Sequence, residues 1–165
     1  MGIEVHPTNM GIMLQQDKYI LDILHIAGMS SYKLVDILIS TLKLAIVSDY
    51  MFSNPTCFRE IVGALQYLTF TRLDIYFTVN KVCQFMHASA DAYWVAVKRI
   101  LCYLNGTISF GLHITCSSSF SLHGFTNIDW ASSVNGRKSI SGYLVYFDCT
   151  LIAWKSVKQR IVSRY

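Results

Sequence analysis

Residues 54–68 read Asn-Pro-Thr-Cys-Phe-Arg-Glu-Ile-Val-Gly-Ala-Leu-Gln-Tyr-Leu and predict the start of a helical segment. Asn54 is a favoured helix cap, and Pro55 suits the first helical position because a helix start leaves that N–H unpaired. Apolar residues then recur at helical spacing, which gives this helix one face for a core. That face is formed by Phe58, Ile61, Val62, Leu65 and Leu68.

The same spacing extends outward from this helix in both directions. It predicts helices over 74–87 and 91–104 downstream, and one over 16–27 upstream. Two short strands, over 2–6 and 11–14, are expected to open the chain as a β-hairpin.

After Gly106 the pattern changes from helices to strands with polar turns. Strands are expected over 108–115, 122–127, 142–147 and 151–155, with Asp148 in a turn. The sequence therefore predicts an α+β fold with a domain boundary between residues 106 and 107. The second part is short, so we expect it to have a weak core.

Composition limits the class of protein. Apolar residues make up 53% of the 165, charged residues 15%, and the mean hydropathy is +0.38, which excludes a disordered charged tail. The net charge of +4 is uneven, because residues 130–165 contain six Lys or Arg against Asp148 alone. A basic end is compatible with nucleic-acid contact and equally with an ordinary solvated surface.

The five cysteines are scattered and form no C-x-x-C pair, which argues against a disulfide framework or a zinc site. They are interpreted as buried thiols in a reducing compartment. The start of the sequence resembles no secretory signal, and the uncharged stretch 100–128 has too many polar residues for a membrane span. We therefore expect an intracellular, non-secreted protein without a membrane partner, in the nucleus, cytoplasm or mitochondrion.

Several stretches together carry a resemblance that covers nearly the whole chain in order. They are residues 2–5, 16–24, 58–68, 71–75, 96–107, 129–131 and 137–143, with Asp129-Trp130-Ala131 and Arg137-Lys138-Ser139 near the end. In these stretches the chain resembles the Pol polyprotein of copia-type long-terminal-repeat retrotransposons.

The resemblance implies a position within that polyprotein. Residues 1–106 would correspond to the C-terminal part of a reverse transcriptase, comprising the end of the palm and thumb- or connection-like helices. Residues 107–165 would be the opening strands of a ribonuclease H-like domain, a truncated antiparallel sheet. The parent family is an RNA-directed DNA polymerase with ribonuclease H activity, and it uses Mg²⁺.

The chain departs from the family where catalysis would need carboxylates. Asn127 occupies the position of the first ribonuclease H aspartate, and its amide brings no charge to a hard Mg²⁺ ion. Asp129 alone is not expected to hold a metal, and the family's next carboxylate lies beyond the stretch from Lys158 to Tyr165. The polymerase aspartate pair is also missing. We therefore expect no catalytic residues, no metal site, no cofactor and no enzyme activity.

Three hypotheses remain open at this point. The first is a degenerate, non-catalytic Pol fragment, and the second is a module that weakly binds an RNA–DNA hybrid through its phosphates. The residues that would contact the nucleic acid are Lys98, Arg99, Arg137, Lys138, Lys155, Lys158, Arg160 and Arg164. The third is an enzyme that becomes active when a partner chain completes it. No small-molecule ligand is predicted.

Other departures suggest an element that is decaying without selection. The family commonly has proline where this chain has Leu34, Leu38 and Leu73, and threonine where it has Ile37 and Ile140. Each of these changes needs one C-to-T transition. Lost prolines enlarge the unfolded ensemble, at up to about 1 kcal/mol each.

Overall fold

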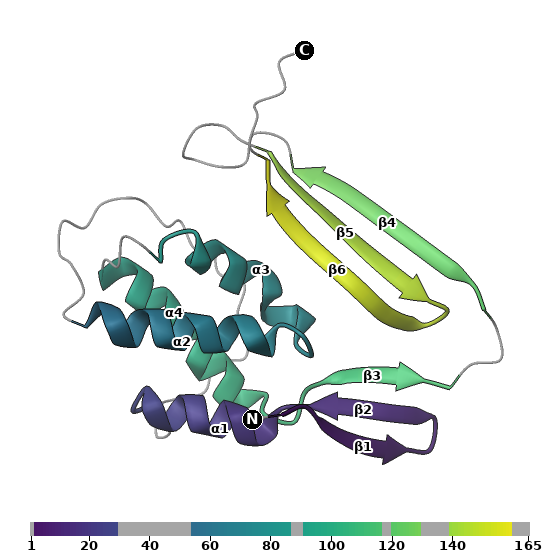
Figure 1. Cartoon of the computed structure of the whole chain (residues 1–165), viewed down its shortest axis with the longest axis horizontal. Helices are drawn as coiled ribbons and strands as arrows, with labels where there is room; N and C mark the ends of the chain where they lie inside the picture. The colour runs from purple at the N-terminus through teal and green to yellow at the C-terminus, as the bar shows by residue number, and fades with distance from the viewer. Residues whose placement is uncertain (1, 30–53, 87–90, 117–119, 130–138, 160–165) are drawn as a thin grey trace, which may run out of the picture. The chain divides into compact units, whose positions relative to one another are not determined.

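The computed structural model describes residues 2–29, 54–86, 91–116, 120–129 and 139–159. Its four helices and two three-stranded sheets form a mixed α+β fold, which confirms the predicted fold class (Figure 1). The elements are β1 (Glu4–Thr8), β2 (Gly11–Gln15), α1 (Asp17–Ile26), α2 (Pro55–Leu68), α3 (Leu73–Cys83), α4 (Asp91–Gly106), β3 (Leu112–Thr115), β4 (Leu122–Asp129), β5 (Ile140–Phe147) and β6 (Thr150–Lys158).

The helices begin where the sequence predicts but do not all end there. Asn54 caps α2, and its side-chain Oδ1 accepts a hydrogen bond from the Cys57 N–H at 3.1 Å. Helix α3 ends at Cys83, whereas the apolar spacing predicted a helix as far as residue 87. The chain tightens there, because the N–H of Phe85 donates to the carbonyl three residues before it.

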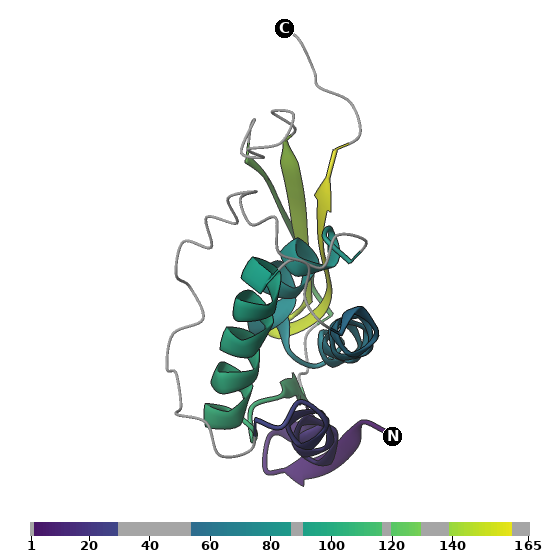
Figure 2. The same cartoon turned by 90° about the vertical axis from the view of Figure 1, so that its left-hand side faces the viewer.

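The four helices pack as one group. Helix α1 contacts α2 and α4, and α3 contacts the same two helices. Figure 2 views α1 and α2 nearly end-on while α4 runs across the view, so α4 is steeply inclined to both. The buried core of this group is Ile20, Ile23, Leu24, Met29, Phe58, Ile61, Val62, Leu65, Leu68, Ile75, Val79, Val82, Tyr93, Ala96, Val97, Ile100, Leu101 and Leu104.

The first sheet has the strand order β1-β2-β3. Gly11 is required in it, because its φ of 152° lies in the region that favours glycine and a side chain would collide with the carbonyl of Ile114. The predicted strand over 108–115 is too long at its start. Residues 107–110 instead form a turn in which the Phe110 N–H donates to the Thr107 carbonyl at 3.1 Å.

The second sheet is an antiparallel meander of strand order β4-β5-β6. Asn127 pairs with Gly142, which pairs on its other side with Ser156. The register shifts between Val145 and Tyr146. Asp148 lies in the turn between β5 and β6 with a φ of 51°, and this confirms its predicted place. The likeness of this sheet to a ribonuclease H domain stays a prediction.

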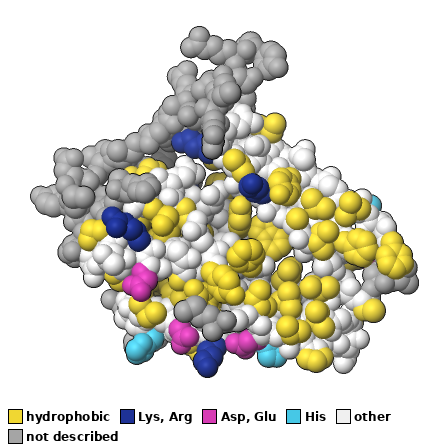
Figure 3. All heavy atoms as spheres, viewed as in Figure 1, with side chains coloured by type: hydrophobic (Ala, Val, Ile, Leu, Met, Phe, Trp, Pro, Cys, Tyr) yellow, Lys and Arg dark blue, Asp and Glu magenta, His cyan; other side chains and the backbone are white. Residues whose placement is uncertain are grey.

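The chain divides into two compact units, one of residues 1–6 with 14–112 and one of 7–13 with 113–165. The predicted boundary between residues 106 and 107 stays a prediction. Among the described residues, Leu151 is the one buried apolar side chain of the second unit. Figure 3 shows many apolar side chains at the surface in the region of β4–β6. This unit therefore has little core of its own in the described part of the chain.

The cysteines differ from their interpretation as buried thiols. Cys57, Cys83 and Cys102 are half-buried, but Cys116 and Cys149 are exposed, so the prediction is wrong for these two. Cys116 directly follows β3, and Cys149 lies in the turn that directly precedes β6. Burial raises the pKa of the Cys83 thiol to about 11. No helix in the described ranges is long and apolar enough to cross a membrane.

Candidate functional site

The basic residues singled out from the sequence lie in both units. Lys98 and Arg99 are half-buried on α4, and the Lys98 ammonium lies 5.9 Å from the centre of the Trp94 ring. The Nε of Arg99 is buried and has no hydrogen-bond partner among the described residues. Lys155 is exposed and Lys158 half-buried on β6. Arg137, Lys138, Arg160 and Arg164 lie outside the described residues.

The position at which the resemblance implies a carboxylate is on β4. Asn127 is exposed and sits opposite Gly142 on β5. Asp129 is paired in the same ladder with Ile140, which in turn pairs with Lys158. Within the ranges that the structure describes, no group of three or more His, Cys, Asp or Glu residues could hold a metal ion.

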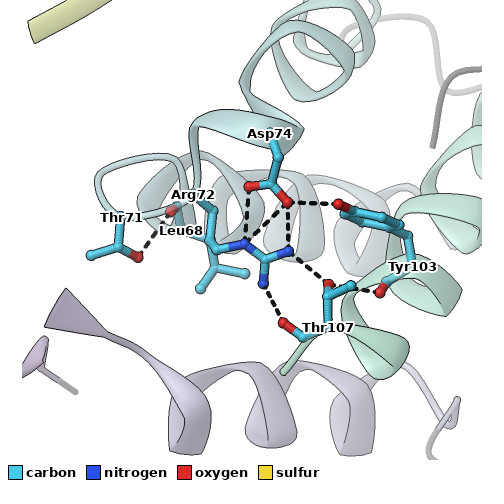
Figure 4. Close-up of polar contacts among 6 residues, drawn as sticks. All are labelled: Leu68, Thr71, Arg72, Asp74, Tyr103 and Thr107. Carbon is cyan, nitrogen blue, oxygen red and sulfur yellow. Dashed lines mark hydrogen bonds and ion pairs between the residues drawn. The ribbon is translucent and has the colours of Figure 1, made fainter. Parts of the chain in front are cut away.

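A buried arginine, Arg72, and a partly exposed aspartate, Asp74, form an ion pair that several hydrogen bonds hold in place (Figure 4). Arg72 is 1% exposed and precedes α3, where its Nε and Nη2 donate to the Asp74 carboxylate at 3.0 and 2.6 Å. Its Nη1 donates to the Thr107 carbonyl at 2.8 Å and its Nη2 to the Thr107 hydroxyl at 2.7 Å. The guanidinium thus ties the start of α3 to the end of α4, where helix carbonyls lack intrahelical partners.

Aromatic side chains complete this cluster. The Tyr103 hydroxyl donates to Asp74 at 2.9 Å, and the guanidinium lies 5.8 Å from the Tyr103 ring and 5.6 Å from the Phe110 ring. Burial raises the pKa of Asp74, but the hydrogen bonds and charge of Arg72 outweigh it, so the pKa lies below its usual value. Burial and the bond to Asp74 raise the pKa of Tyr103. Asp74 is therefore held ionised, which suits a structural link.

A second buried contact lies beside the first. Thr71 and Gln16 are 2% and 1% exposed, and the Thr71 hydroxyl donates to the Gln16 Oε1 at 2.7 Å. This bond joins the residue before α1 to the turn between α2 and α3. Together Thr71 and Arg72 connect that turn to the start of α1 and the end of α4. The turn between α2 and α3 therefore links all four helices.

From the sequence, residues 71–75 indicated only the family resemblance, and this role of Thr71 and Arg72 was not predicted. The available signal was an arginine and an aspartate two residues apart at a helix start, within otherwise apolar surroundings. This local signal could not indicate that Thr107 is the partner. Thr107 lies 35 residues away in sequence and accepts two of the Arg72 hydrogen bonds.

The comparisons with known proteins connect the chain to transposons. It is 39% identical over 165 residues to the retrovirus-related Pol polyprotein from transposon RE2 of Arabidopsis thaliana, and 40% identical over 165 residues to that from transposon RE1. It is also 39% identical over 164 residues to an uncharacterised mitochondrial protein of that plant. No protein-family model matches the chain, and no solved structure matches it significantly.

These matches cover 99% of the chain, 11% of each transposon polyprotein and 68% of the mitochondrial protein. The chain belongs to the family of copia-type retrovirus-related Pol polyproteins from transposons. It spans about a tenth of the length of the RE1 and RE2 polyproteins that it matches.

Proposed function

We propose that this chain is a non-catalytic piece of a Pol polyprotein, spanning the end of the reverse transcriptase and the start of the ribonuclease H domain. The observation that carries the proposal is Asn127, an amide on β4 at the position where the family resemblance requires a metal-binding carboxylate. Two-metal phosphate chemistry needs several carboxylates around the ions, and a neutral amide contributes no charge to that balance. The order of helices followed by an antiparallel meander supports the assignment to these two regions.

A cleavage assay tests the proposal. The chain is incubated with a labelled RNA–DNA hybrid in Mg²⁺ or Mn²⁺, and we expect no cleavage. Asn127→Asp is also expected to be silent, because one restored carboxylate beside Asp129 does not complete a two-metal site.

Cleavage by the unmodified chain that disappears in Asp129→Asn would overturn the proposal. That control also separates the chain's own activity from a contaminating nuclease, because a contaminant would not respond to the substitution. Cleavage gained only in Asn127→Asp would confine the lesion to this one position and leave the unmodified chain non-catalytic.

A second candidate function is weak binding of an RNA–DNA hybrid through its phosphates. It is favoured by Lys155, which is exposed on the open β4–β6 sheet, and by the Lys98–Arg99 pair on α4. Fluorescence anisotropy of a labelled hybrid across a salt series tests it, since each phosphate contact that is lost reduces the salt dependence by about one unit of slope. Lys155→Gln and Lys98→Gln should each reduce the slope, and no binding at low salt would remove this candidate.

A further inference from the structure

Two exposed cysteines lie beside a hydrogen-bonded contact between β3 and β6. Thr150 is 4% exposed, and its hydroxyl accepts a hydrogen bond from the Thr115 N–H at 3.1 Å. The two threonine hydroxyls are also hydrogen-bonded to each other at 2.9 Å, although the residues are 35 positions apart in the sequence. Cys116 directly follows Thr115, and Cys149 directly precedes Thr150. All four residues belong to the same compact unit.

A second contact shows how the chain runs past the first. The Asp148 N–H donates to the Ser121 carbonyl at 2.7 Å, so the turn before β6 is bonded to the chain after β3 at two places. The chain passes these two places in opposite directions on the β3 side and on the β6 side. Cys116 and Cys149 are therefore the next residues inward from the threonine contact. Facing residues of antiparallel segments have Cα atoms about 4.5–5.5 Å apart, which is within the span of a disulfide, about 4.4–6.8 Å.

Hydrogen bonds hold the backbone at both cysteines, while solvent reaches their side chains. The Cys116 N–H donates to the carbonyl of Met10, in the turn between β1 and β2, at 2.7 Å. Cys149 lies in the turn between β5 and β6, next to Asp148. Both cysteines are exposed, whereas the other three cysteines of the chain are half-buried. A fixed backbone keeps the pair together, and exposure admits a small oxidant.

We propose that Cys116 and Cys149 are a redox-sensitive pair that forms a reversible disulfide between the end of β3 and the turn before β6. The oxidant is a low-molecular-weight disulfide such as oxidised glutathione. One cysteine thiolate attacks it, forms a mixed disulfide and releases one glutathione thiolate. The other cysteine thiolate then attacks the protein sulfur of the mixed disulfide and releases the second. The two protein thiols thereby lose two electrons and two protons, and oxidised glutathione becomes two molecules of the reduced form.

The disulfide stabilises a part of the chain that has little core of its own. Closing residues 116–149 into a loop restricts the unfolded chain, which favours the folded sheet β4–β6. We expect oxidation to raise the melting temperature of the sheet by about 10 °C. Excess reduced glutathione reverses the change, so the sheet is more stable under oxidising than under reducing conditions. The redox pair uses neither Asn127 nor a bound nucleic acid.

The test incubates the full chain in buffers with an increasing ratio of oxidised to reduced glutathione. Free thiols are then alkylated, and disulfides are mapped by mass spectrometry. We expect one link within each chain, from Cys116 to Cys149. Cys116→Ser and Cys149→Ser should each abolish the link and the rise in melting temperature. Cys102→Ser is the matched control and should change neither, since it removes a half-buried thiol on α4 and leaves the pair intact.

Two further measurements separate the role of the fold from chance pairing. In concentrated urea, the same buffers should give a mixture of links among the five cysteines, because the folded backbone no longer raises the effective concentration of one thiol at the other. Both serine variants should melt like the reduced unmodified chain, because serine replaces an exposed side chain. Cys116→Ala and Cys149→Ala repeat the test if a serine variant does not fold.

Four results would overturn the redox pair. The first is the absence of a link between Cys116 and Cys149, whether the thiols stay reduced or each carries glutathione. The second is a disulfide between two chains instead of within one. The third is a link that forms in urea with the same preference as in the folded chain. The fourth is a link that leaves the melting temperature unchanged, which would remove its role in stabilising the sheet.

Discussion

The helical unit and the β4–β6 sheet are both built from largely apolar sequence but bury it to different extents. In the helical unit the apolar stripes of four helices face one another, and side chains such as Ile100 and Leu101 are fully buried. In the sheet, large apolar side chains such as Ile128 and Ile152 are 58% and 52% exposed. A three-stranded meander buries a face only against a second layer, whereas four crossing helices cover each other.

This difference in burial determines which region contributes most to the stability of the chain. Burial of apolar surface is the main favourable contribution to folding, so the helical unit should hold most of the free energy of unfolding. The sheet depends on its backbone hydrogen bonds and on pairs such as Phe125 with Tyr146, whose rings lie 5.9 Å apart. Its outer strands β4 and β6 also leave edges that can pair with other chains.

A matched pair of isoleucines gives the largest expected effect. Ile100→Ala on α4 removes a fully buried side chain and should lower the free energy of unfolding by about 3 kcal/mol. Ile152→Ala on β6 removes a half-exposed one and should lower it by less than about 1 kcal/mol. Thermal circular dichroism, with hydrogen exchange of peptides from each unit, measures both. Equal losses would mean that the sheet is covered in solution.

The ion pair of Arg72 and Asp74 gives the next largest effect. Asp74→Asn leaves the Arg72 guanidinium buried without its anion and should lower the free energy of unfolding by about 2 kcal/mol. The pKa of Asp74 is lower in the folded chain than in the unfolded one. Its contribution is therefore complete at neutral pH and is lost as the pH falls below 3.8 and through the folded-state pKa.

Acid titrations of the two proteins check this prediction. The unmodified chain should lose stability more steeply than Asp74→Asn over the acid range, while the two curves run parallel above about pH 5. Asp22→Asn, on the surface of α1, serves as a control for the loss of a carboxylate. If Asp74→Asn loses stability with falling pH as steeply as the unmodified chain, the ion pair of Arg72 and Asp74 does not contribute through its charge.

Local signals in the sequence were sufficient for most of the fold. The Asn54–Pro55 start of α2 and the turn at Asp148 depend on residues close together in the chain, and both were predicted. The predicted end of α3 and the predicted start of β3 were wrong, because apolar spacing continues through residues 84–86 and 108–111 while the backbone turns there. Apolar periodicity indicates which side chains can be buried, but it does not indicate where the backbone hydrogen bonding changes.

The candidate site was harder to predict from the sequence than the fold. Asn127 could be located because a missing carboxylate is visible in a motif. The Arg72 cluster depends on which helices pack together, and Thr107 reaches Arg72 because α4 packs against α3. The basic residues were found by composition, which gives charge but not position.

The smallest expected effect comes from comparing how α2 and α3 begin. The residue before α2 is Asn54, with φ −131° and ψ 78°, and the residue before α3 is Arg72, with φ −119° and ψ 80°. Pro55 follows the first, whereas Leu73 follows the second, at a position where the resemblance implies a proline. The backbone at α3 thus has the geometry that already accommodates a proline at α2.

Leu73→Pro should therefore stabilise the helical unit by up to about 1 kcal/mol, because proline restricts the unfolded chain while its ring suits the first helical position. Pro55→Leu is the reciprocal change and should destabilise the unit by a similar amount. Chemical denaturation of the two variants and of their combination measures both effects. Destabilisation by Leu73→Pro would mean that the half-buried Leu73 side chain contributes packing that outweighs the entropy, and the leucine would then be a compensated change and not a lesion.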